Sequence, residues 1–303
     1  MTPQTPRTSK GSLRELLDEK FMSKLDGLDL LSRKILQGKL QGERRSKRRG
    51  TSAEFADHRP YVVGDDLRFI DWNIYGRLEQ LFLKLFLEEQ DLTLHVVLDV
   101  SGSMQSGDPP KDLFAKKLAA ALAYVGLVNN NRVTLTAVAD GIVAQLSNMR
   151  GRKYLPKLAG LLTTKAQGPS DFDNASRQLV SEWTATGVIV VISDFLLKEG
   201  FQEGLRRFVG KRSEVYAIQL LSPQEMSPEL TGDLKLVDVE DDDTAEVTIS
   251  RALLDYYKRN LNAYCNEVKD FCRRRGIVYA LVDSGQSAEN LVLTYLRTAG
   301  MLG

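Results

Sequence analysis

The sequence has few cysteines, no long hydrophobic run and almost no excess charge of either sign. Two cysteines among 303 residues cannot form a disulfide framework. The longest apolar stretch, Leu118 to Val128, is interrupted by Gly126 and is shorter than the roughly 18 to 20 residues that span a bilayer. Lys and Arg number 41 against 40 Asp and Glu, so a chain-wide nucleic-acid or membrane binder is not indicated. Because no signal peptide is recognisable either, we expect a reduced protein in the cytoplasm.

The sequence also lacks the motifs that mark several large classes of enzymes. It contains no G-x-S-x-G, no H-E-x-x-H, no lysine-containing Walker A loop and no G-x-G-x-x-G. Its composition, 43% hydrophobic and 27% charged residues, is that of an ordinary globular protein. We therefore expect a globular protein that is not an enzyme.

The chain divides by composition into three parts. Residues 1–50 are expected to form a polar tail, a helix from Leu13 to about Leu40 and a linker that contains the basic run Arg44 to Arg49. Residues 51–90 are rich in Tyr, Phe, Trp, Gly and Asp. We expect this small extension to pack on the main domain, residues 91–303, because about forty residues rarely bury enough apolar surface to fold alone.

The main domain alternates predicted strands with predicted helices. Leu92 to Leu98 is expected to be its first strand, and the very apolar Val188 to Ile192 is expected to lie centrally in a parallel sheet. The Asp140-Gly141 pair predicts a hairpin between two antiparallel strands. The repeated strand–helix units predict an α/β fold with a doubly wound, mostly parallel sheet, interrupted by an inserted hairpin at about 223–249.

Oxygen-bearing side chains follow two of the predicted strands. Asp99, Ser101 and Ser103 lie in the loop after the first strand, and Asp194 follows the strand Val188 to Ile192. In a doubly wound sheet, ligands bind at the carboxyl ends of the strands where the strand order reverses, so we expect Asp99 and Asp194 to converge there. Carboxylate and hydroxyl oxygens suit Mg²⁺ or Mn²⁺ better than zinc. The alternative is an ordinary turn that caps the next helix.

The pattern DxSxS after the first strand, with an Asp after the fourth, resembles the metal-ion-dependent adhesion site of von Willebrand factor A-type domains. That family has a Thr on an intervening loop, where this chain offers Ser170, with Asp171 and Asp173 as nearby alternatives. The resemblance implies a von Willebrand factor A-like, Rossmann-type topology. It also implies a bound metal ion with one position that accepts a carboxylate of a partner protein.

A second resemblance lies upstream, where Arg59 to Trp72 is similar to the signature RxYxxGDDxRxIDW. This signature belongs to the MoxR-associated family of A-type domain proteins, the bacterial and archaeal group called domain of unknown function fifty-eight. Members are often encoded beside MoxR-type AAA+ ATPases, so the resemblance implies such an ATPase or its client as partner. The matching positions are Arg59, Tyr61, Gly64, Asp65, Asp66, Arg68, Asp71 and Trp72.

We expect the signature to be structural, with Asp–Arg hydrogen bonds that fix a turn. Its large apolar side chains, Tyr61, Phe69, Ile70 and Trp72, are expected to be buried against the main domain.

These observations favour a metal-dependent protein-interaction adaptor that works with a MoxR-type ATPase in the assembly or maturation of protein complexes. The alternative is a Mg²⁺-dependent hydrolase or phosphotransferase with Asp99 as nucleophile. Such enzymes commonly carry a second carboxylate two residues later, where this chain has Ser101. A further alternative is a nucleic-acid-associated protein that uses Arg44 to Arg49, although a neutral chain favours a solvated linker there.

The remaining polar and sulfur-containing residues are expected to be structural. The acidic stretch Asp238 to Asp243 lacks the spacing of an EF-hand loop and is expected to be a charged hairpin tip. Cys265 and Cys272 are expected to be small buried residues. His58 and His95 have no recognisable catalytic neighbour, and we expect them to have satisfied structural roles.

Overall fold

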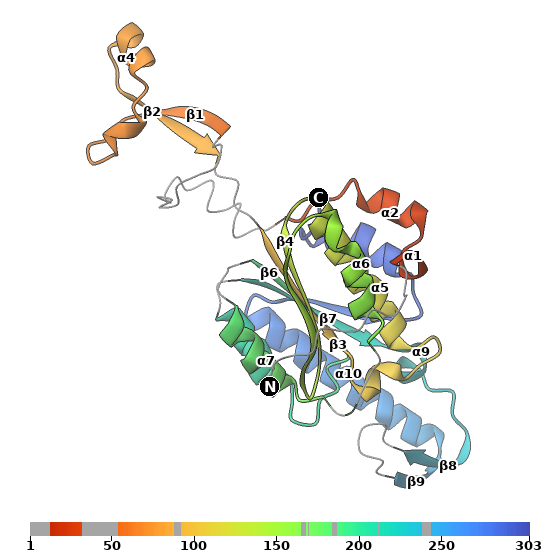
Figure 1. The fold of residues 1–303 in the computed structure, drawn as a ribbon. Coiled ribbons are helices and arrows are strands. Elements are labelled where there is room, and N and C mark those ends of the chain that lie inside the picture. The colour runs from red at the N-terminus through yellow and green to blue at the C-terminus, as the bar shows by residue number, and fades with distance from the viewer. Residues whose placement is uncertain are drawn as a thin grey trace. The chain divides into compact units, whose positions relative to one another are not determined.

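The computed structural model describes residues 13–31, 54–87, 92–164, 168, 170–183, 187–210, 213–237 and 244–303 (Figure 1). The basic run Arg44 to Arg49, the acidic stretch Asp238 to Asp243 and residues 32–40 of the predicted N-terminal helix lie outside these residues. The chain consists of two compact units, which are described separately. The main unit comprises Met1–Gln41 and Leu92–Gly303, and the small unit comprises Gly42–Asp91.

A six-stranded sheet forms the centre of the main unit. Its strands in spatial order are β10 (Val278–Asp283), β7 (Glu214–Leu221), β6 (Val188–Ser193), β3 (Thr93–Asp99), β4 (Arg132–Ala139) and β5 (Gly141–Met149). All neighbours are parallel except β4 and β5, which form the predicted hairpin. If the six strands are renumbered 1 to 6 by their order along the chain and read from the β5 edge, their spatial order is 3-2-1-4-5-6. This is the doubly wound order of Rossmann-type sheets. The predicted fold class is confirmed.

Helices cover both faces of this sheet (Figure 1). One face is packed by α5 (Lys111–Val128), α6 (Leu155–Leu162) and the C-terminal α11 (Ala288–Asn290) with the π-helical turn η4 (Leu291–Leu296). The other face is packed by α7 (Phe172–Glu182), α8 (Gln202–Val209) and α10 (Arg251–Arg274). The short 3-10 helices η2 (Gly102–Gln105) and η3 (Arg152–Tyr154) precede α5 and α6.

Alternate residues of the buried strands enter two separate cores. On β3, Val96 and Leu98 contact the core on the α5 side, whereas Val97 contacts the core on the α7 side. Because side chains of a strand alternate between faces, a strand covered on both faces must be apolar throughout. This explains the continuous apolar run of β6, in which every residue is buried.

The N-terminal segment contradicts the prediction of one long helix from Leu13 to about Leu40. It forms α1 (Leu13–Leu16) and α2 (Glu19–Leu25), separated at Asp18, whose carboxylate accepts the N–H of Phe21 and caps α2. After α2 the chain becomes extended, and Leu30 forms a β-bridge with Leu302. The apolar residues that gave the helical period still face inward, because Leu17 and Phe21 belong to the main core.

The predicted inserted hairpin is present after β7. The short helix α9 (Pro223–Met226) comes first and is followed by the antiparallel pair β8 (Gly232–Val237) and β9 (Thr244–Ile249). The small unit contains another antiparallel pair, β1 (Glu54–Pro60) and β2 (Phe82–Leu87). The 3-10 helix η1 (Leu67–Phe69) and the helix α4 (Trp72–Leu78) lie between these two strands in the sequence.

Candidate functional site

The sheet topology places the two predicted carboxylates together. Asp99 is the last residue of β3, and Asp194 directly follows β6, the parallel neighbour of β3. The chain leaves β3 toward β4 on one side and reaches β6 on the other, so this is the point where the strand order reverses. Ser193 joins the two loops, since its hydroxyl donates to Oδ2 of Asp99 at 2.6 Å. The predicted convergence is confirmed.

The loop after β3 places two hydroxyl groups next to each other. The backbone N–H of Ser101 donates to Oδ1 of Asp99 at 2.9 Å, which folds the loop back over the end of its strand. Ser101 then begins η2 as its N-terminal cap, although its side chain makes no capping hydrogen bond. Its hydroxyl is instead 3.1 Å from the hydroxyl of Ser103. The alternative of an ordinary helix-capping loop therefore does not describe the Ser101 side chain.

The two carboxylates are buried, and the surroundings of Asp99 disfavour its negative charge. Asp99 and Asp194 are 3% and 1% exposed. Burial, followed by the charge of Asp194, raises the pKa of Asp99 to about 6, against the hydrogen bonds from Ser193 and Ser101. Two ionised carboxylates buried this close repel each other, and a cation between them would remove that repulsion.

One cation is already supplied by a residue that the sequence analysis did not single out. Lys111, the first residue of α5, has a fully buried side chain. Its Nζ is 2.8 Å from Oδ2 of Asp194 and 2.6 Å from Oε1 of Glu225 in α9. Burial by itself would lower the pKa of Lys111, but the charges of Asp194 and Glu225 outweigh it and raise the pKa above its usual value.

A signal for Lys111 is present in the sequence. Lys111 is followed at helical spacing by Phe114, Ala115 and Leu118, all of which are buried. A charged residue on the apolar face of a helix needs a partner in the interior, because an unpaired buried charge is costly. That this partner is shared with the candidate site depends on the tertiary fold.

The donor set fits a small divalent ion. Two adjacent ligands of an octahedral Mg²⁺ ion lie about 3 Å apart, and the hydroxyls of Ser101 and Ser103 are 3.1 Å apart. Asp99, Asp194 and Glu225 bring three negative charges and Lys111 one positive charge, which leaves an excess that a divalent ion would neutralise. The described residues contain no cluster of three or more His, Cys, Asp or Glu side chains suited to a metal. A metal ion at this place would therefore need the serine hydroxyls as ligands.

The loop that contains Ser170, the predicted third source of metal ligands, is described only in part. The backbone N–H of Gly102 donates to the carbonyl of Gly168 at 2.9 Å, so the loop before α7 lies beside the site. Ser170 is half-buried in this loop, and its role as a ligand stays a prediction. The two nearby carboxylates have other partners: Asp171 caps α7 through the N–H of Asn174, and Asp173 pairs with Arg207 and Arg177.

In the small unit, the signature residues fix turns by hydrogen bonds, as predicted. Arg59 Nη2 is 2.7 Å from Oδ1 of Asp65, and Asp66 caps η1 and pairs with Arg68. Gly64 has a φ of +107°, a conformation that favours glycine.

Asp71 caps α4 and lies 3.0 Å from Nε2 of His58. The hydrogen bond from His58 is the main reason why the pKa of Asp71 falls to about 2.

Within the small unit itself, one of the large apolar signature residues is buried and two are largely exposed. Ile70 is buried and forms a bridge with Leu83, but Phe69 and Trp72 are 48% and 63% exposed. A two-stranded sheet and one seven-residue helix offer too few neighbours to cover these side chains. The packing of residues 51–90 on the main domain stays a prediction.

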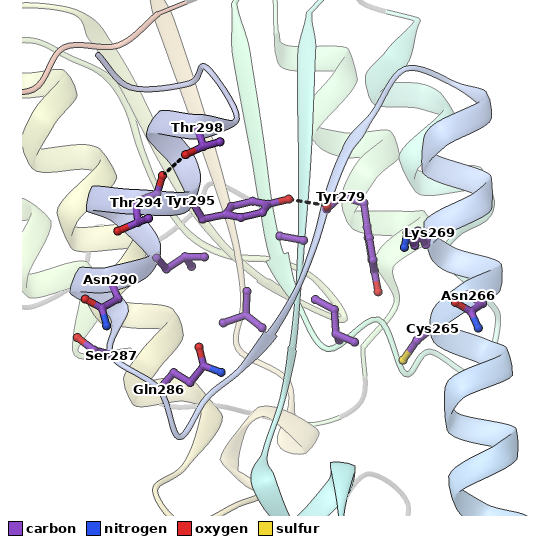
Figure 2. Close-up of a pocket in the computed structure, with 14 residues that line it drawn as sticks. Cys265, Asn266, Lys269, Tyr279, Gln286, Ser287, Asn290, Thr294, Tyr295 and Thr298 are labelled. Carbon is purple, nitrogen blue, oxygen red and sulfur yellow. Dashed lines mark hydrogen bonds between the residues drawn. The ribbon is translucent and has the colours of Figure 1, made fainter.

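A groove of about 690 Å³ lies along the edge strand β10 (Figure 2). Its walls come from α10, β10 and the C-terminal helical segment, and Lys269 is the one charged residue among those that line it. None of the residues of the candidate metal site lines this groove. The groove and the candidate site are therefore separate features.

The fold and the site together define the class of protein. A doubly wound α/β domain with a DxSxS loop and a second Asp at the reversal of strand order is a von Willebrand factor A-like domain. The chain belongs to the family described as protein of unknown function DUF58, whose model matches residues 57–267.

Proteins described as uncharacterized resemble the chain over most of its length. Uncharacterized proteins of Mycobacterium bovis and Mycobacterium tuberculosis are 28% identical over 258 residues, which is 83% of this chain and 81% of theirs.

Among solved structures, the conserved hypothetical protein BatB from Bacteroides thetaiotaomicron has a TM-score of 0.41 at 14% identity, with 68% of this chain and 98% of that chain covered. An aerotolerance-related membrane protein from Bacteroides fragilis has a TM-score of 0.42 at 16% identity, with 68% and 99% covered. In this chain, no helix within the described ranges is long and apolar enough to cross a membrane.

Proposed function

We propose that this protein is a non-enzymatic adaptor whose A-like domain binds a protein partner through a divalent metal ion. The observation that carries the proposal is the pair of hydroxyls 3.1 Å apart beside two buried carboxylates at the switch point of the sheet. Asp99, Ser101, Ser103 and Asp194 would hold Mg²⁺ or Mn²⁺, with Ser170 as a further donor. When bound, the ion supplies a position at which a carboxylate of the partner is held.

The partner in this proposal is a MoxR-type AAA+ ATPase or its client, and the process is the assembly or maturation of protein complexes. The support is the family membership together with the signature Arg59 to Trp72. A location in the cytoplasm, with Cys265 and Cys272 reduced, is part of the same proposal. Both thiols are free and buried.

The metal is tested first, by calorimetric titration of the full chain with Mg²⁺ and Mn²⁺. We expect one site of modest affinity in the wild type and none in Asp99→Ala. Glu203→Ala is the matched control, because it removes an exposed carboxylate that pairs with Arg206 in α8, and it should bind like the wild type. Identical titrations of wild type and Asp99→Ala would refute the metal site.

The partner is tested by capture of the ATPase on the immobilised full chain. We expect capture with Mg²⁺, loss with EDTA, and loss with Asp99→Ala and Asp194→Ala while both variants keep a wild-type circular dichroism spectrum. Equal capture by Asp99→Ala would show that the interface lies elsewhere, and the basic run Arg44 to Arg49 would be examined next.

A further inference from the structure

A buried lysine and its two carboxylate partners lie directly against the candidate metal site. The Lys111 side chain has no exposed surface, and its partners Asp194 and Glu225 are 1% and 21% exposed. A lysine at the first residue of a helix can easily reach solvent, since its long side chain is flexible. Here it points inward to a carboxylate that the metal site also uses.

Lys111 and a metal ion would draw on the same carboxylate. Oδ1 of Asp194 accepts the N–H of Leu196 at 3.0 Å, while Oδ2 accepts from Lys111 at 2.8 Å. An ammonium group beside Asp194 offsets the negative charge that attracts a metal ion. In an interior of low dielectric constant this effect extends over several ångströms.

Glu225 acts in the opposite sense. Its carboxylate lies 2.6 Å from the Lys111 ammonium and offsets part of that positive charge. Glu225 is also held in place, because Ser106 donates to Oε1 at 3.0 Å and the backbone N–H of Ser222 donates to Oε2 at 2.7 Å. Ser106 belongs to the loop that carries the hydroxyls of Ser101 and Ser103. The Lys111–Glu225 ion pair is therefore connected to the candidate site twice, through Asp194 and through Ser106.

We infer that Lys111 and Glu225 set the affinity of the metal site: Lys111 weakens divalent-ion binding through Asp194, and Glu225 restores part of it. The inference rests on the proposed metal site. It assigns both residues a positioning and electrostatic role, with no direct contact to the ion. A built-in cation of this kind makes the metal exchangeable and supports the fold of the loop when no metal is bound.

The test compares two variants that break the same ion pair from opposite ends. Lys111→Met should bind Mg²⁺ roughly tenfold more tightly than the wild type, because it removes a positive charge. Glu225→Gln should bind several-fold more weakly, because it leaves Asp194 as the only carboxylate beside Lys111 among its two partners. Both variants should unfold at a lower temperature than the wild type. Lys116→Met is the matched control, since it removes a lysine of α5 that pairs with Asp112, and its Mg²⁺ affinity should be unchanged.

Opposite shifts in affinity separate this role from a purely structural one, which would weaken binding in both variants. Binding by Lys111→Met that is equal to or weaker than that of the wild type would overturn the inference while leaving the metal site intact. If Lys111→Met does not fold, Lys111→Gln takes its place, because it also removes the charge but keeps a hydrogen-bond donor for Asp194, and it should also bind Mg²⁺ more tightly than the wild type. No Mg²⁺ binding by the wild type would refute the metal site itself, and this inference with it.

Discussion

His95, in the middle of β3, provides a pH-dependent test of the core. It is 4% exposed, and neither ring nitrogen has a hydrogen-bond partner in the described part of the chain. Its ring packs on Trp183 with centroids 4.1 Å apart. The expectation of a satisfied structural role is therefore wrong for its hydrogen bonds, because the ring is held by packing alone. Burial lowers the pKa of His95 to about 4.

The sign of the effect follows from which state binds the proton. The unfolded chain protonates His95 near pH 6.5, whereas the folded chain does so only near pH 4. Stability is therefore fully present above pH 6.5 and falls as the pH is lowered from 6.5 to 4. A difference of about 2.5 in pKa, at about 1.4 kcal/mol for each unit, makes the total loss about 3.5 kcal/mol.

The measurement is urea unfolding of wild type and His95→Leu at pH 7.5 and pH 4.5. Other groups titrate in both proteins, so the difference between the two proteins isolates His95. We expect His95→Leu to gain about 2 to 3 kcal/mol relative to the wild type between these pH values. A difference that does not change with pH would refute the argument and would mean that the imidazole is protonated, or reached by water, in the folded protein.

Two further predictions concern glycine and the small unit. A Cβ on Gly187 would lie 2.0 Å from the carbonyl oxygen of Thr93, so Gly187→Ala should lower the melting temperature strongly. A Cβ on Gly160 would have nothing within 4 Å, so Gly160→Ala should raise stability by about 0.5 to 1 kcal/mol. Equal effects of the two substitutions in calorimetry would contradict this packing. Trp72→Ala should cost less than about 1 kcal/mol and buried Ile70→Ala about 2 or more. A loss of several kcal/mol at Trp72 would show that another part of the chain covers it.

Local sequence patterns determined most of the architecture of the main unit. Continuous apolar runs identify its central strands, which are covered on both faces, and period-3.6 apolar patterns identify its helices. The convergence of Asp99 with Asp194 also follows from the sequence, since parallel strands that are neighbours at the switch point end at the same edge. The DxSxS spacing then predicts the hydroxyl pair, and the structure confirms it.

The tertiary structure decided which distant groups meet. The predicted N-terminal helix is broken at Asp18, because this residue caps the start of α2. After α2, the chain is held by the β-bridge between Leu30 and Leu302, which are far apart in the sequence. The pairing of Lys111 with Glu225 joins residues 114 positions apart. Periodicity shows that a side chain points inward, but the identity of its polar partner depends on which loops the fold brings to that point. For this reason the sequence locates the carboxylates and hydroxyls of the site and indicates that Lys111 points inward, but it does not reveal that Lys111 pairs with Asp194 and Glu225.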